Sequence, residues 1–190
     1  MKRVKNNFPS RIYLIGFMGS GKSTLGKEVA KKIGYEFFDT DDAMEKKLKM
    51  KIKNIIEKKG MDFFKEAEKE IFYETFSLEK TVIATGGGLP VYEDNITKMK
   101  QRGMVIWLKP SVKELCKRLQ KHKSGRPLIA NIPMADLPFF IEMLLQRRIK
   151  FYRRAHAIIE SDKISAEKIK REIKKFYNLK KKSFFFTCDL

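Results

Sequence analysis

The chain has 190 residues, 43% of them hydrophobic, which suffices for one compact domain with a real core and excludes a disordered chain. No apolar run approaches the ~20 residues that span a bilayer, and the run from Ile12 to Phe17 is too short for a signal peptide, so we expect a soluble protein without a membrane partner. The formal net charge of +19 attracts anions. The lysines are nevertheless spread along the predicted helices rather than gathered with stacking aromatics, which disfavours nucleic acid as the main partner. Cys116 and Cys188 lack metal-binding or disulfide spacing, which indicates free thiols in a reducing cytoplasm.

Predicted strands and helices alternate along the chain. Short aliphatic runs predict buried strands, and apolar residues spaced three to four apart predict the helices between them. The predicted strands are Arg11 to Gly16, Tyr35 to Phe38, Thr81 to Thr85, Met104 to Leu108 and Ala157 to Glu160, and a last helix starts near Ser165. This order predicts an α/β fold of three layers, with a five-stranded parallel sheet between helices, in a single domain over residues 1–190.

A phosphate-binding motif follows the first predicted strand. Residues 16–23 match G-x-x-x-x-G-K-[ST], between a predicted strand and a predicted helix, which is the context that this motif requires. Gly19 and Gly21 let successive N–H groups face phosphate oxygens, Lys22 would bridge the β- and γ-phosphates, and Ser23 would offer a hydroxyl to Mg²⁺. A mere tight turn is the alternative, but a turn does not need the Lys-Ser pair. The motif therefore predicts nucleotide binding.

Carboxylates follow the second predicted strand, in Asp39-Thr40-Asp41-Asp42. If the strand alternation continues, Asp39 and Asp41 point the same way at the carboxyl edge of the sheet, where open α/β folds bind ligands. One of the two could then reach the metal waters, and the other could orient and deprotonate an acceptor hydroxyl. The alternative is that Asp41 or Asp42 caps the next helix. The phosphate-binding motif favours the catalytic reading of Asp41.

A long helical insertion is predicted between the second and third strands, over residues 43–79, with an interruption at Lys59-Gly60. We expect it to carry a substrate site. Three glycines, Gly86, Gly87 and Gly88, follow the third strand and remove every side chain between backbone and ligand. Their N–H groups could hold a carboxylate or hydroxyls at the same edge of the sheet.

A second irregular region, residues 121–138, holds several prolines among basic residues. A loop of this length in a compact domain is usually functional, and it is predicted to be a lid. The last segment, residues 178–190, combines lysines with phenylalanines and is treated as a tail, either frayed or an exposed patch.

The motifs together resemble those of the shikimate kinases. That family has a P-loop, a D-x-D after the second strand, a G-G-G after the third, an R-P-L in the lid, and an arginine before a tyrosine in a late helix. They recur here in order, from about residue 11 to residue 177, as Gly19-Ser20-Gly21-Lys22-Ser23-Thr24, Asp39-Thr40-Asp41, Gly86-Gly87-Gly88, Arg126-Pro127-Leu128, and Arg147-Arg148 with Tyr152.

The resemblance implies an ATP- and Mg²⁺-dependent kinase that phosphorylates the 3-hydroxyl of shikimate. It implies that Asp39 supports the magnesium site with Ser23, that Arg126 closes with the lid over the transferring phosphoryl group, and that Arg118 stacks on adenine. The implied nucleotide site comprises Gly19, Ser20, Gly21, Lys22, Ser23, Thr24, Arg118 and Arg126.

On the acceptor side, the resemblance implies that Asp41 binds ring hydroxyls and acts as the base, that Gly87 and its two neighbours touch the substrate, and that Arg148 pairs with the substrate carboxylate. One departure affects this side. The family has a second carboxylate-binding arginine in the insertion, where this chain has Lys65. Lysine keeps the charge but loses the two-pronged geometry of a guanidinium, which predicts a weaker grip on shikimate or an altered substrate.

Other functions remain open from the sequence. A related P-loop kinase could act on gluconate or a nucleotide, and a catalytically weak relative could bind nucleotide and use its basic surface for docking. The D-x-D and G-G-G pair fits a polyol acid better, and a pure binding module has no use for Lys22, Asp41 and Arg126 together. A monomer is the default expectation.

Overall fold

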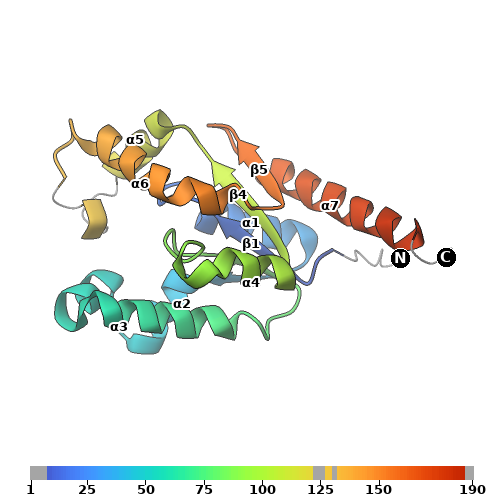
Figure 1. Ribbon diagram of the computed structural model, residues 1–190, viewed down its shortest axis with the longest axis horizontal. Helices are drawn as coiled ribbons and strands as arrows, with labels where there is room; N and C mark the ends of the chain where they lie inside the picture. The colour runs from blue at the N-terminus through green and yellow to red at the C-terminus, as the bar shows by residue number, and fades with distance from the viewer. Residues whose placement is uncertain (1–7, 122–126, 130–131, 187–190) are drawn as a thin grey trace.

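A parallel β-sheet forms the centre of the molecule. The computed structural model of this protein describes residues 8–121, 127–129 and 132–186 (Figure 1). The sheet has five strands in the order β2-β3-β1-β4-β5, and every neighbouring pair is parallel. The strands are β1 (Arg11–Ile15), β2 (Glu36–Asp39), β3 (Thr81–Ala84), β4 (Met104–Lys109) and β5 (Ala157–Glu160). The five predicted strands and the α/β fold class are therefore confirmed.

Helices cover both faces of this sheet (Figure 1). They are α1 (Lys22–Ile33), α2 (Thr40–Leu48), α3 (Ile52–Glu74), α4 (Asn95–Arg102), α5 (Val112–Gln120), α6 (Leu137–Tyr152) and α7 (Ala166–Phe186), with short 3₁₀ turns η1 (Tyr92–Asp94) and η2 (Pro127–Ile129). No helix in the described ranges combines the length and apolar composition needed to cross a membrane.

The two faces of the sheet carry separate cores. Alternate residues of β1 point to opposite faces, so Ile12 and Leu14 pack toward α1 and α7, while Tyr13 and Ile15 pack toward α3, α4 and α6. Both faces of these strands are buried, which explains why the sequence shows continuous apolar runs rather than alternation. The layered arrangement leaves the strand ends as the place for polar chemistry.

The carboxyl ends of three neighbouring strands meet at one edge. Leu14 in β1 and Asp39 in β2 are both in register with Ala84 in β3. The loops that follow β1, β2 and β3 therefore leave the sheet at the same level, which brings the P-loop, the carboxylates and the glycine triplet together.

The insertion between β2 and β3 consists of α2 and α3, packed around Met44, Ile55 and Ile71. The first helix begins at Thr40, before the predicted start at residue 43. The interruption that Lys59-Gly60 predicted is a kink inside α3, where Gly60 has φ 84° and ψ 171°. Glycine adopts this left-handed backbone without the steric cost of a Cβ.

Two predicted boundaries can be compared with the structure near the chain's end. Of the predicted lid, residues 122–126 and 130–131 lie outside the described residues, and its last part is the start of α6 at Leu137. The helix expected near Ser165 begins at Ala166 and continues to Phe186, so it includes most of the segment treated as a tail from residue 178. Neither glycine nor proline occurs in α7 to end it earlier.

Candidate active site

The P-loop connects β1 to α1 through backbone conformations that favour glycine. Gly16, Gly19 and Gly21 have φ values of 146°, 78° and 93°. A Cβ on Gly16 would lie 2.6 Å from the Leu108 carbonyl oxygen, so that position admits no side chain. The glycines thus serve the turn that places the N-terminus of α1 toward the cavity, where its N–H groups can receive phosphate oxygens.

Lys22 lies inside the curve of this loop. Its Nζ donates to the carbonyl oxygens of Gly16 at 2.9 Å and Phe17 at 3.0 Å. Ser20 is fully buried beneath the loop, whereas Ser23 and Thr24 are exposed at the start of α1. The ammonium group is therefore held beside the place where phosphates would sit.

The carboxylate of Asp39 accepts hydrogen bonds both from the end of the P-loop and from the first turn of α2. Its Oδ2 accepts a hydrogen bond from Ser23 Oγ at 2.6 Å, and its Oδ1 accepts from the backbone N–H groups of Asp41 at 3.0 Å and Asp42 at 3.4 Å. Asp39 is thus the N-cap of α2, a role that the sequence argument considered only for Asp41 and Asp42.

The expected strand alternation of Asp39 and Asp41 is wrong, because the chain turns into helix at Thr40. Both carboxylates nevertheless line the same cavity, since the first turn of α2 stands at the sheet edge. The hydroxyl of Ser23 and the carboxylate of Asp39 form a hard oxygen pair next to the phosphate-binding loop. This pair fits Mg²⁺, which takes few protein ligands and completes its shell with water and phosphate oxygens.

Asp41 is half-buried in the cavity wall. Burial, together with the neighbouring charge of Asp39, raises the pKa of Asp41 to about 6, while Lys22 acts in the opposite direction. A carboxyl group with a pKa raised toward neutrality is better matched to accept a hydroxyl proton than an ordinary aspartate.

The glycine triplet packs against these carboxylates. Gly86 N–H donates to Thr40 Oγ1 at 2.8 Å. A Cβ on Gly86 would lie 2.6 Å from Glu68 Oε1 and 2.9 Å from Asp41 Oδ1. The missing side chain at Gly86 is thus what allows two acidic groups from different helices to approach the same backbone.

Arg148 reaches the cavity from α6. The two adjacent arginines of this helix differ, since Arg147 is exposed while Arg148 is half-buried and lines the cavity. The guanidinium lies 5.5 Å from the ring centroid of Phe17. One helical turn later, Tyr152 donates its hydroxyl to the Gly87 carbonyl oxygen at 2.5 Å. The helix and the glycine triplet are thereby joined beside the arginine.

Glu68 is a cavity residue that the sequence argument missed. It projects from α3 and is 6% exposed. Burial and the charge of Asp41 raise its pKa to about 8, against the lowering effects of Arg148 and Lys65. Nothing in the sequence distinguishes it from the other acidic residues of the insertion, except that it follows Lys65 by three residues and so shares its helix face.

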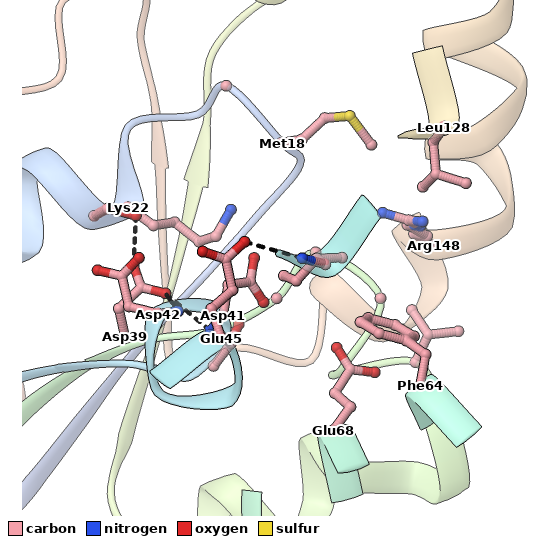
Figure 2. A pocket seen from close by; sticks show the side chains of 18 of the residues that line it. Met18, Lys22, Asp39, Asp41, Asp42, Glu45, Phe64, Glu68, Leu128 and Arg148 are labelled. Carbon is pink, nitrogen blue, oxygen red and sulfur yellow. Dashed lines mark hydrogen bonds between the residues drawn. The ribbon is translucent and has the colours of Figure 1, made fainter. Parts of the chain in front are cut away.

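The charged side chains of Lys22, Asp39, Asp41, Glu68 and Arg148 line one cavity of about 1220 Å³. Figure 2 shows Lys22, Asp39 and Asp41 on one side, facing Phe64, Glu68 and Arg148 on the other. The cavity brings together most of the predicted site residues: Gly19, Gly21, Lys22, Ser23, Thr24, Asp39, Asp41, Lys65, Gly86, Gly87, Gly88, Arg118 and Arg148.

The predicted roles of two further arginines, Arg118 and Arg126, are not tested by the structure. Arg118 is half-buried at the cavity, where its guanidinium contacts Glu114 at 2.7 Å, the Gly19 carbonyl at 3.3 Å and the Asp162 carbonyl at 3.0 Å. It therefore borders the P-loop, and its stacking on adenine stays a prediction. Arg126 lies outside the described residues, so its role also stays a prediction.

Comparisons of sequence and of structure with known proteins point to the same family. The family model described as shikimate kinase matches residues 18–178. The shikimate kinase of Sulfurihydrogenibium sp. strain YO3AOP1 is 41% identical over 162 residues, which cover 85% of this chain and 94% of that protein. Among solved structures, the shikimate kinase from Acinetobacter baumannii in complex with shikimate superposes with a TM-score of 0.79 at 33% identity, covering 92% of this chain and 94% of that one.

A gluconokinase from Sinorhizobium meliloti 1021 is also similar, with a TM-score of 0.59 and 22% identity over 94% of this chain and 97% of that one. At this identity the likeness shows a shared fold alone. This likeness therefore gives the gluconate alternative no support as a function.

Proposed function

Because the chain belongs to the shikimate kinase family, we propose that it transfers the γ-phosphoryl group of ATP to the 3-hydroxyl of shikimate. The observation that carries the assignment of the chemistry is the shared cavity, in which Lys22 from the P-loop and Asp41 from α2 line the same space as the glycine triplet. Phosphoryl transfer needs little covalent chemistry from a protein, so positioning and charge neutralisation suffice.

The nucleotide side of the cavity is assigned to the P-loop. Its N–H groups and the N-terminus of α1 hold the phosphates, and Lys22 leaves its carbonyl partners to bridge the β- and γ-phosphates. Ser23 and Asp39 would hold the magnesium ion, which would supply positive charge to neutralise the phosphates. Arg118 borders adenine, and Arg126 closes over the γ-phosphoryl group.

The acceptor side is assigned to groups from three elements. Asp41 orients the attacking hydroxyl and accepts its proton, and the peptide N–H groups of the glycine triplet contact the substrate. Arg148 and Lys65 bind the substrate carboxylate from opposite elements, α6 and α3. Glu68 interacts electrostatically with these two cations and with the base, and its raised pKa favours the protonated, neutral form near pH 7.

An ADP-release assay with MgATP tests this function, with shikimate, gluconate, quinate and nucleoside monophosphates as acceptors and Asp41→Asn as the blank. We expect turnover with shikimate that is lost in Asp41→Asn. Turnover of another acceptor in its place would assign the cavity to that acid or nucleotide. Binding of ATP without turnover of any acceptor would contradict kinase activity.

The proposal includes a monomer that works in the cytoplasm, without nucleic acid or membrane partners. Within the described residues, every group assigned to the cavity comes from a single chain, so a second copy is not needed to complete the site. Cys116 is a buried thiol without a disulfide, as suits a reducing compartment that also supplies ATP.

A further inference from the structure

The ammonium group of Lys65 lies over an aromatic ring. Lys65 Nζ is 5.4 Å from the centroid of Tyr92, within the ~6 Å at which a cation is attracted to the face of a ring. Both side chains are half-buried, and both line the cavity. The contact therefore acts at the position where lysine replaces the arginine of the family pattern.

The ring belongs to a turn that is fastened to the same helix. Glu93, next to Tyr92 in η1, pairs with Lys69 at 3.1 Å. Lys69 follows Lys65 by four residues, so both contacts lie on one face of α3. Two non-covalent contacts, made by Lys65 and Lys69 one helical turn apart, thus hold η1 against α3.

The backbone of this turn is strained. Glu93 and Asp94 have φ values of 44° and 54°, in the left-handed region that residues other than glycine rarely adopt. Such conformations persist where the surroundings hold them, here through the pairing of Glu93 with Lys69 and of Asp94 with Arg154. These contacts therefore fix the position of the turn that carries Tyr92, beside Lys65.

The flexibility of lysine at this position explains why a contact with the ring would matter. Its charge sits at the end of a flexible four-carbon chain, whereas a guanidinium is planar and grips a carboxylate with two donors. Holding the ammonium against a ring removes part of its conformational freedom before the acceptor arrives. On the basis of the proposed function, we propose that Tyr92 is a positioning residue that holds Lys65 toward the carboxylate of the acceptor.

Steady-state kinetics of ring-removing and ring-keeping variants test this role. We expect Tyr92→Leu to raise KM for shikimate about five-fold and to leave kcat and KM for ATP near the wild-type values. Tyr92→Phe keeps the aromatic face and is expected to retain the wild-type KM. An equal loss in both variants, or a fall in kcat alone, would overturn the positioning role.

A matched control and a double variant isolate the pair. Tyr73 has the same kind of contact, with Lys98 Nζ 5.4 Å from its ring, but is not part of the cavity lining. Tyr73→Leu should therefore leave KM for shikimate unchanged. In a Lys65→Met background, Tyr92→Leu should add little further loss, whereas a full additional rise in KM would show that Tyr92 does not act through Lys65.

The contact has its own readout, independent of activity. Reductive methylation with ¹³C-formaldehyde keeps the charge of lysine, and the Lys65 resonance is assigned by its absence in Lys65→Arg. We expect an upfield ring-current shift that is lost in Tyr92→Leu and kept in Tyr92→Phe. A resonance that does not move in Tyr92→Leu overturns the pair, and a lost shift with unchanged KM overturns the positioning role. Absence of shikimate turnover in the wild type overturns the proposed function and the role together, and the shift then shows whether the pair itself exists.

Discussion

At the level of single residues, two carboxyl groups from different helices share the acceptor side of the cavity. Burial raises the pKa of both Asp41 in α2 and Glu68 in α3, and the charge of Asp41 raises the pKa of Glu68 further. The protonated form of each carboxyl group is therefore less costly to bury than the charged form. The opposing cations Lys65 and Arg148 lower the pKa of Glu68, but burial outweighs them.

Replacing Glu68 by glutamine should stabilise the fold in a pH-dependent way. Burial raises the pKa of Glu68 in the folded state to about 8, from an ordinary value of 4.5. Its contribution to stability is fully present below the unfolded value and is lost as pH rises through the folded value. The Tm of Glu68→Gln should therefore match wild type near pH 4.5 and exceed it by roughly 3 °C or more near pH 9, as thermal unfolding would show.

Glu70→Gln is a suitable control for that experiment, since Glu70 is exposed on the same helix. A constant difference in Tm across the pH range would show that Glu68 does not change its protonation between the folded and unfolded states.

The Lys65→Arg substitution should strengthen binding of shikimate. A guanidinium adds a second donor in a planar fork and can stack on Tyr92 in the same way as lysine. One further charge-assisted hydrogen bond, worth about 1 kcal/mol, corresponds to a KM about five-fold lower. An unchanged or higher KM for shikimate would count against a role for this position in binding the carboxylate.

At the level of elements, the loop after β3 acts as a spacer between helices. Its first glycine leaves room for carboxylates from α2 and α3, and the second receives the hydroxyl of Tyr152 from α6. The geometry of the cavity therefore depends on three helices meeting one short stretch of backbone.

Adding a methyl group at Gly86 should disturb this meeting point. The Cβ of Gly86→Ala would lie 2.6 Å from Glu68 Oε1 and 2.9 Å from Asp41 Oδ1, so both carboxylates must move. Because the clashing atoms are the ends of flexible side chains, we expect little loss of stability but a marked fall in kcat, measured by denaturant unfolding and the kinase assay. Gly88→Ala is the matched variant for stability, because a Cβ there meets nothing within 4 Å. An unchanged kcat in Gly86→Ala would contradict the spacer role of Gly86.

At the level of the whole molecule, the net charge of +19 creates a positive field around a cavity whose ligands are anions. Raising the salt concentration from about 20 mM to about 500 mM should screen this field and lower kcat/KM for shikimate about five-fold, mainly through KM. Kinetics across that range provide the measurement. A kcat/KM that stays constant would show that the basic surface does not contribute to substrate capture.

Much of the fold and of the nucleotide side could be read from the sequence. The strand order along the chain and the P-loop were predictable because each depends on neighbouring residues, such as Lys22 and Ser23 after a glycine turn. The acceptor side was less accessible. Glu68 carries no local signal of its burial. On the magnesium side, Asp39 caps a helix whose start at Thr40 was not foreseen.

By itself, the sequence determined the fold class, the phosphate-binding loop and the family, because these depend on local motifs and on the spacing of apolar residues. Only the tertiary structure decided which carboxyl groups share a cavity and that Lys65 lies over the ring of Tyr92. Those outcomes depend on how α3 and η1 pack against the sheet edge. The spacing of residues along α3 does not fix the rotation of this helix about its axis, because charged residues point in several directions at each turn.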